Sequence, residues 1–242
     1  MMTKELPKEA ETTKKKKPAP HLFISDWLNE FEATRAKEFH RRTGLDYKTL
    51  LKQIIEAADP HPGMHVLEVA AGTGMIARHL VGLVGSEGKI ISADSTKELL
   101  EQARLDAQSA KVGTRIEWRV APLNRLPFPK EEFDLVTCGL GFNQLEAKDL
   151  FGESYRILKE EGVLLIAAEV TSPNGTSFPQ KLRQQYYRLL KREHEEARSH
   201  FYTSDELSEM LRVAGFRQII LRGLKGDAAL ASRDFSLIKA VK

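Results

Sequence analysis

The stretch Val66-Leu67-Glu68-Val69-Ala70-Ala71-Gly72-Thr73-Gly74 decides the fold. Its short apolar run leads into a turn with two glycines, and the residues that follow, Met75–Val84, have a helical pattern. Glycine lets the backbone turn sharply and lets a ligand approach the main chain closely. The helix after the turn presents unpaired N–H groups and the positive end of its dipole to that ligand. The stretch therefore predicts a buried strand, a binding loop and a helix.

Short apolar runs alternate with helical segments along the rest of the central region. The predicted strands are Met64–Val69, Lys89–Ala93, Arg115–Val120, Phe133–Cys138 and Gly162–Glu169. The helical segments between them are Met75–Val84, Ser95–Ala110 and Ala147–Leu158. This alternation predicts an α/β fold with a parallel sheet and helices on both faces. The run Val163–Ala168 is apolar without alternation, as expected for a strand buried on both sides.

The flanking regions differ from this pattern. Before the first strand, helical spacing predicts two helices, Asp26–Arg41 and Asp46–Ala58. After the fifth strand we expect a long helix at Phe178–Arg198 and a shorter one at Ser204–Ala214. Two apolar runs then follow, Phe216–Leu224 and Asp234–Val241. Because only residues 225–233 separate these runs and no helix fits there, we expect them to pair antiparallel.

We expect three parts in the chain: a disordered Lys-rich tail at 1–20, a helical cap at 21–62, and a binding domain at 63–242 with a helical insertion at 170–200. The net charge of +3 comes from 37 Lys+Arg and 34 Asp+Glu. The tail holds six of the lysines and three of the glutamates, so the remaining body has 31 charges of each sign. The body therefore lacks the net positive charge that is typical of a nucleic-acid-binding domain. The Lys-rich tail could still contact an acidic partner.

The sequence lacks the patterns typical of membrane-spanning, disulfide-bonded and metal-binding proteins. No apolar run approaches the roughly 18 residues that a membrane helix needs, so we expect no span. The single cysteine, Cys138, cannot form an internal disulfide, which favours a reducing, cytoplasmic location. The seven histidines have no spacing typical of metal ligands, and we expect no metal.

The glycine loop alone allows two kinds of cofactor. Gly72-Thr73-Gly74-Met75-Ile76-Ala77 fits the dinucleotide pattern G-x-G-x-x-A, and Asp94 follows at the end of the second strand. A carboxylate there can accept hydrogen bonds from ribose hydroxyls in either case. A nicotinamide-dependent oxidoreductase is therefore an open alternative at this point.

Four stretches, in order, resemble class I S-adenosylmethionine-dependent methyltransferases. They are E-x-A-x-G-x-G from Glu68, Leu126-Pro127-Phe128-Pro129 with Phe133-Asp134-Leu135-Val136, the run Glu153–Gly162, and Tyr202–Leu207 with Ala214-Gly215-Phe216. The closest resemblance is to the ubiquinone/menaquinone C-methyltransferase-like group, including Cys138-Gly139-Leu140-Gly141-Phe142 after the fourth strand. The resemblance implies a Rossmann-like methyltransferase fold with a mostly parallel seven-stranded sheet that ends in an antiparallel pair.

The resemblance also implies roles for individual residues around S-adenosylmethionine. The implied cofactor residues are Glu68 for the loop and the amino group, Ala70, Gly72 and Gly74 for the methionine part, Asp94 and Ser95 for the ribose and adenosine, Leu123 for adenine, and Gly139 at the end of the fourth strand. The chain has Ala121 and Pro122 where the family has an acidic residue for the adenine amino group. This departure predicts a weaker or backbone-only contact with adenine.

The implied activity is methyl transfer by in-line displacement to a small molecule, which the sequence does not identify. The cap and the insertion would cover the acceptor, and their candidate contact residues are His21, Tyr186, Tyr187, His200 and Tyr202. No catalytic base is predicted, and the sequence is silent on oligomeric state. Two further hypotheses are an RNA or protein methyltransferase that uses the tail, and a binding module without catalysis.

Overall fold

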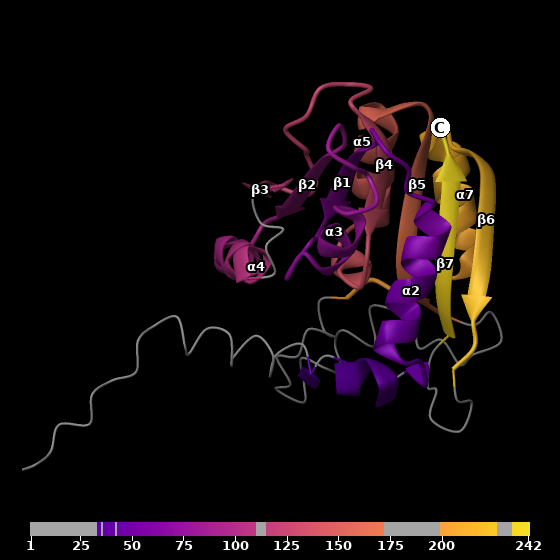
Figure 1. The fold of residues 1–242 in the computed structure, drawn as a ribbon. Helices are drawn as coiled ribbons and strands as arrows, with labels where there is room; N and C mark the ends of the chain where they lie inside the picture. The colour runs from indigo at the N-terminus through magenta and orange to yellow at the C-terminus, as the bar shows by residue number, and fades with distance from the viewer. Residues whose placement is uncertain (1–32, 35, 42, 110–114, 172–198, 227–233) are drawn as a thin grey trace, which may run out of the picture.

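The structure is a computed structural model that describes residues 33–34, 36–41, 43–109, 115–171, 199–226 and 234–242. Its centre is a sheet of seven strands in the order β3-β2-β1-β4-β5-β7-β6 (Figure 1). The strands are β1 (His65–Val69), β2 (Lys89–Asp94), β3 (Ile116–Val120), β4 (Phe133–Cys138), β5 (Leu158–Val170), β6 (Arg217–Leu224) and β7 (Asp234–Val241). The first five are parallel, and β7 pairs antiparallel with both β5 and β6. The predicted fold class is confirmed.

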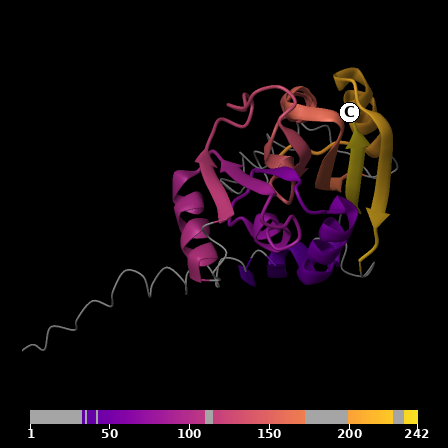
Figure 2. The same ribbon diagram turned by 45° about the horizontal axis from the view of Figure 1, so that its top comes forward.

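Helices cover both faces of this sheet. They are α2 (Tyr47–Ala58), α3 (Met75–Leu80), α4 (Lys97–Ser109), α5 (Ala147–Ile157) and α7 (Ser204–Ala214), with a 3₁₀ turn, η2, at Phe142–Gln144. In Figure 2, α2 and α3 lie on one side of the sheet and α5 and α7 on the other. Val66 packs with α2 and α3, and its neighbour Leu67 packs with α5 and α7. Both side chains are fully buried, as the unbroken apolar run predicts.

Most predicted boundaries agree with the structure within a few residues, and two differ for clear reasons. The strand predicted from Gly162 begins at Leu158, because Leu158 already pairs with Phe133 before a register shift in the β4–β5 ladder. The helix predicted to reach Val84 ends at Leu80, and turns occupy the next residues up to Gly85, whose φ is 69°. Val81, the C-cap of α3, keeps helical backbone, and Gly85 has the left-handed φ that is natural for glycine.

The ends of α7 illustrate how local chemistry sets an element. Thr203 and Glu206 form a reciprocal capping box at its start. Gly215 ends it with a φ of 106°, a conformation that residues with a Cβ rarely adopt. Both boundaries are those that the sequence predicts.

Several predictions fall outside the described residues. These are the tail 1–20, the part of the cap at 21–32, and the long helix 178–198 of the insertion. The division into three parts therefore stays a prediction. Among the described residues, no helix has the length and apolar character to cross a membrane. The carboxyl ends of the parallel strands point toward the bottom of Figure 1, where the loops after β1, β2 and β4 meet.

Candidate cofactor site

The glycine loop after β1 has left-handed backbone at three positions. The φ values of Ala70, Gly72 and Gly74 are 52°, 53° and 67°. A Cβ at Gly72 would meet nothing within 4 Å, so this backbone borders open space. A Cβ at Gly74 would instead overlap the ring of Trp118. The first glycine therefore opens the loop to a ligand, and the second lets β3 pack against the loop.

Glu68 holds the start of α3. Its carboxylate accepts hydrogen bonds from the backbone N–H groups of Ile76 and Ala77, both at 3.2 Å, and from Ser92 Oγ at 2.9 Å. The N-cap residue, Gly74, has no side chain, so Glu68 satisfies two helix donors that would otherwise be unpaired. Burial raises the pKa of Glu68 to about 7, against the opposing effect of these hydrogen bonds.

Asp94, at the end of β2, connects the loop to α4. Its Oδ2 accepts from Gly72 N at 2.9 Å, and its Oδ1 accepts from Thr96 N at 2.9 Å. Asp94 thus fixes the glycine loop and starts the next helix at the same time. Each carboxylate oxygen has more than one lone pair, so both can still accept from a diol.

The loop after β4 forms the opposite wall and is anchored from behind. Asn143 Nδ2 donates to the carbonyls of Glu169 and His200, both at 2.9 Å, and its Oδ1 accepts from Glu169 N at 3.0 Å. His200 N donates to Asn143 O at 2.6 Å. These bonds fix residues 139–145 against the end of β5 and against the chain that returns at residue 199.

A cavity of about 200 Å³ lies between these loops. Its walls include seven of the eight predicted cofactor residues: Glu68, Ala70, Gly72, Asp94, Ser95, Leu123 and Gly139. Gly74 is not part of the wall, because it packs beneath the loop against Trp118. Ala121 and Pro122, which replace the expected acidic residue, do not line the cavity either.

Sequence reasoning missed several wall residues. They are Tyr47, Ala71, Thr73, Met75, Ile76, Thr96, Leu99, Leu140, Gly141, Gln144 and Leu145. Five of them directly neighbour predicted residues, so adjacency could have found Ala71, Thr73, Met75, Thr96 and Leu140. Tyr47 could not have been found in this way, since it comes from α2 and no motif includes it.

The acceptor candidates are only partly described. His21, Tyr186 and Tyr187 lie outside the described residues. The rings of His200 and Tyr202 stack with centroids 6.4 Å apart, and both side chains contact the carboxylate of Glu146. Burial raises the pKa of Tyr202. The structure brings these two residues together beside the loop after β4, but neither lines the cavity.

The described residues contain no cluster of metal ligands, and their one cysteine is buried. No group of three His, Cys, Asp or Glu side chains there could hold a metal ion. Cys138 is fully buried, and burial together with the carboxylates of Glu68 and Asp94 raises the pKa of its thiol far above the ordinary range. The thiol therefore stays protonated and acts as a small apolar side chain.

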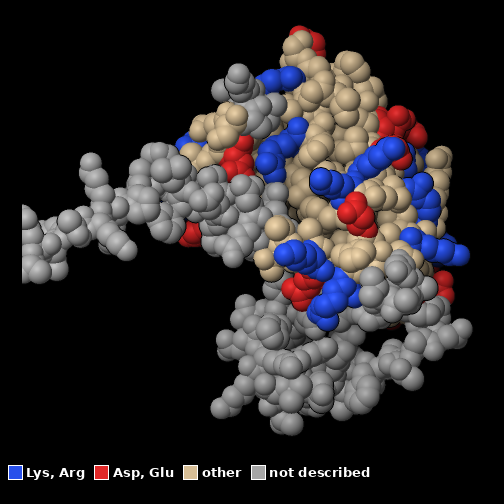
Figure 3. All heavy atoms as spheres, turned by 60° about the horizontal axis from the view of Figure 1, so that its bottom comes forward, with Lys and Arg blue, Asp and Glu red and all other residues tan. Residues whose placement is uncertain are grey.

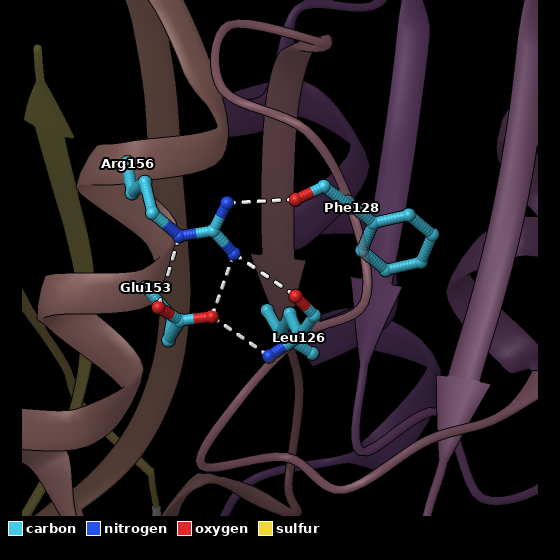
Figure 4. Close-up of polar contacts among 4 residues, drawn as sticks. All are labelled: Leu126, Phe128, Glu153 and Arg156. Atoms are coloured by element: carbon cyan, nitrogen blue, oxygen red, sulfur yellow. Dashed lines mark hydrogen bonds and ion pairs between the residues drawn. The ribbon is translucent and has the colours of Figure 1, made fainter.

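The stretch Glu153–Gly162 supports the site from a distance. Arg156 donates to the carbonyls of Leu126 and Phe128 at 2.9 and 2.7 Å and pairs with Glu153, which accepts from Leu126 N at 2.7 Å (Figure 4). One ion pair on α5 thus holds the loop that carries Leu126-Pro127-Phe128. This loop follows Leu123, a wall residue of the cavity.

Comparison with known proteins decides between the two cofactor classes. A family model described as a methyltransferase domain matches residues 66–162. A ubiquinone/menaquinone biosynthesis C-methyltransferase from Shewanella sp. is 28% identical over 182 residues, which cover 69% of this chain and 72% of the relative.

Two solved structures share the fold. A SAM-dependent methyltransferase from Aquifex aeolicus is 20% identical with a TM-score of 0.58, covering 79% of this chain and 88% of its own. Geranyl diphosphate C-methyltransferase from Streptomyces coelicolor A3(2) is 13% identical with a TM-score of 0.65, covering 80% and 78%. Residues 66–162 thus match a methyltransferase domain, the fold is that of S-adenosylmethionine-dependent methyltransferases, and the chain is similar to the ubiquinone/menaquinone C-methyltransferases.

Proposed function

We propose that the protein transfers the methyl group of S-adenosylmethionine to a small-molecule acceptor at the cavity between the loops after β1, β2 and β4. The observation that carries this proposal is the convergence of Gly72, Asp94 and Gly139 on one cavity from three separate strand ends. Ligands of open α/β sheets bind in such crevices outside the carboxyl ends of the strands.

The chemistry of the wall fits the parts of the cofactor. Asp94 would accept hydrogen bonds from the ribose hydroxyls, with Ser95 beside it, and Leu123 would pack against adenine. The bare backbone at Gly72 leaves room for the methionine part. Glu68 acts through the loop: its hydrogen bonds to α3 support the orienting role implied by the sequence, and contact with the cofactor amino group stays a proposal.

The sulfonium supplies an activated methyl group, so the main task of the protein is alignment. Holding the acceptor atom about 3–3.5 Å from the methyl carbon, in line with the breaking bond, lowers the barrier by several kcal/mol. The anchored loop at residues 139–145 and Tyr47 are the described groups best placed to border the acceptor.

A small-molecule acceptor is supported by two observations. One relative is a C-methyltransferase of ubiquinone/menaquinone biosynthesis, and one structural neighbour is a geranyl diphosphate C-methyltransferase. On the face of the molecule in Figure 3, Lys and Arg lie interspersed with Asp and Glu and with uncharged residues, which is unlike the continuous basic surface that binds nucleic acid. We also propose a cytoplasmic location, in line with the single buried cysteine.

The test is calorimetric titration with S-adenosylmethionine, S-adenosylhomocysteine and NAD. We expect the first two to bind with a Kd on the order of micromolar and NAD to give no binding. The Asp94→Ala variant should bind S-adenosylhomocysteine more than about tenfold more weakly, since charge-assisted hydrogen bonds contribute about 1.5–3 kcal/mol.

The matched control is Asp149→Ala, an exposed aspartate on α5, which should leave the affinity unchanged. Tight binding of NAD without a response to the other two ligands would overturn the proposal. An unchanged affinity of Asp94→Ala would show that Asp94 is only a structural cap.

A further inference from the structure

A second, larger cavity lies on the outer side of the wall formed by α2 and α3. Its volume is about 1180 Å³, against about 200 Å³ for the cofactor cavity. Its apolar walls are Leu51 and Ile55 of α2 and Leu83 after α3, the last with a 45% exposed side chain. We call this cavity the α2–α3 groove. We expect another segment or molecule to pack on its apolar surface, because large exposed apolar patches mark interaction sites.

Positive charge prevails at the edge of the groove. Lys48, Lys52 and Arg78 line it, together with Asp46 and Glu56. Asp46 caps α2 through Thr49, Glu56 pairs with Lys52 at 3.7 Å, and Arg78 pairs with Asp106 at 3.9 Å, so three cations against two carboxylates leave the lining with one positive charge in excess. An occupant with apolar side chains and acidic flanks would suit this lining.

The segment 21–32 of the same chain has this composition. Its sequence is His21-Leu-Phe-Ile-Ser-Asp-Trp-Leu-Asn-Glu-Phe-Glu32, with three acidic residues and no Lys or Arg. Phe23, Trp27 and Phe31 recur at a spacing of four, the spacing of one helical face.

The residues that follow the segment in the sequence already lie at the groove. Ala33, which directly follows the segment, and Ala36, one helical turn further, both line the groove. A segment that begins at the groove needs no long connection, so the entropic cost of holding it there is small.

We propose that residues 22–32 pack into the α2–α3 groove of their own chain. Tyr47 and Met75 line both the groove and the cofactor cavity. The packed segment therefore supports the cofactor wall from behind, and its loss weakens cofactor binding without touching any residue on the inner side.

The test uses Trp27 as a probe in the full chain. The protein has two tryptophans, so the Trp27 signal is the difference between each protein and its Trp27→Phe counterpart. We expect blue-shifted emission and acrylamide quenching several-fold weaker than for a peptide of residues 18–34. The groove variant Leu51→Lys/Ile55→Lys and the segment variant Leu28→Lys/Phe31→Lys should both restore strong quenching. Both variants should also weaken binding of S-adenosylhomocysteine several-fold.

Val213→Lys is the matched control, because Val213 is 76% exposed on α7, across the sheet from the groove. It should leave quenching and affinity unchanged. The proposal would be overturned if acrylamide quenched Trp27 as strongly in the protein as in the peptide. It would also be overturned if Trp27 were shielded and the groove variant left its quenching unchanged. Shielding that grows with protein concentration would also overturn it, since the segment would then occupy the groove of a second copy. The segment variant keeps the test decisive if the groove variant fails to fold.

Discussion

At the scale of single residues, the two glycines of the loop have different tasks that substitution can separate. Alanine at Gly72 costs about 1–2 kcal/mol for its left-handed backbone, and its Cβ would enter open space at the wall of the cavity proposed for the cofactor. We expect Gly72→Ala to weaken S-adenosylhomocysteine binding more than it lowers stability. Gly74→Ala has the same backbone cost and must also displace Trp118, so we expect the larger loss of unfolding free energy. Calorimetric titration and urea unfolding of both variants give the ranking, and equal effects on both measures would contradict it.

Glu68 should make the stability of the fold depend on pH. Its pKa is about 7 in the folded protein against 4.5 as the ordinary value, so between these values the folded state holds a proton that the unfolded state has lost. The unfolding free energy should therefore fall as pH rises through this window and level off above pH 7. Glu68→Gln has no such proton. The difference in unfolding free energy between the wild type and this variant should therefore change between pH 4.5 and 7. Parallel stability curves of the wild type and Glu68→Gln would show that Glu68 is ionised throughout.

At the scale of elements, the Glu153–Arg156 pair on α5 is worth more than an ordinary helix salt bridge. Arg156→Ala removes the side-chain donor of the Phe128 carbonyl and one of the two donors of the Leu126 carbonyl, which still accepts from Phe128 N, and we expect a loss of about 2–3 kcal/mol in unfolding free energy. The matched control is Arg212→Ala, which breaks the exposed pair with Glu209 at the same spacing on α7. Such surface pairs contribute about 0.2–1 kcal/mol. Equal losses in urea unfolding would mean that the loop does not depend on Arg156.

The elements themselves were largely predictable because their signals are local. The run Val66–Val69 is buried on both faces, and Thr203 with Glu206 is a cap that the sequence displays directly. The start of β5 was not predictable, because it depends on pairing between Leu158 and Phe133, far apart in the chain. Tyr47 was missed for the same reason: its place in the cavity wall is decided by how α2 packs on α3, which no local pattern encodes.

At the scale of the whole molecule, the tail should be dispensable for cofactor binding. Residues 1–20 hold the entire net charge and few apolar groups, so they cannot bury enough surface to offset the entropy of ordering. We expect a chain that starts at His21 to bind S-adenosylhomocysteine with unchanged affinity at low and at high salt. A large loss would mean that the tail contributes to the site. Salt-dependent RNA binding by the full chain alone would revive the macromolecular acceptor.

The position of β7 has a consequence for how the molecule is made. Residues 234–241 are the last described strand to leave the ribosome, yet they lie between β5 and β6, which do not pair with each other. Until they emerge, β6 has no partner in the sheet, and the long apolar strand β5 remains an open edge that can pair with other chains. Contacts of such wide sequence separation also form slowly. The sheet can therefore close only after synthesis of β7, and nascent chains halted before that point should be the ones that aggregate or require a chaperone.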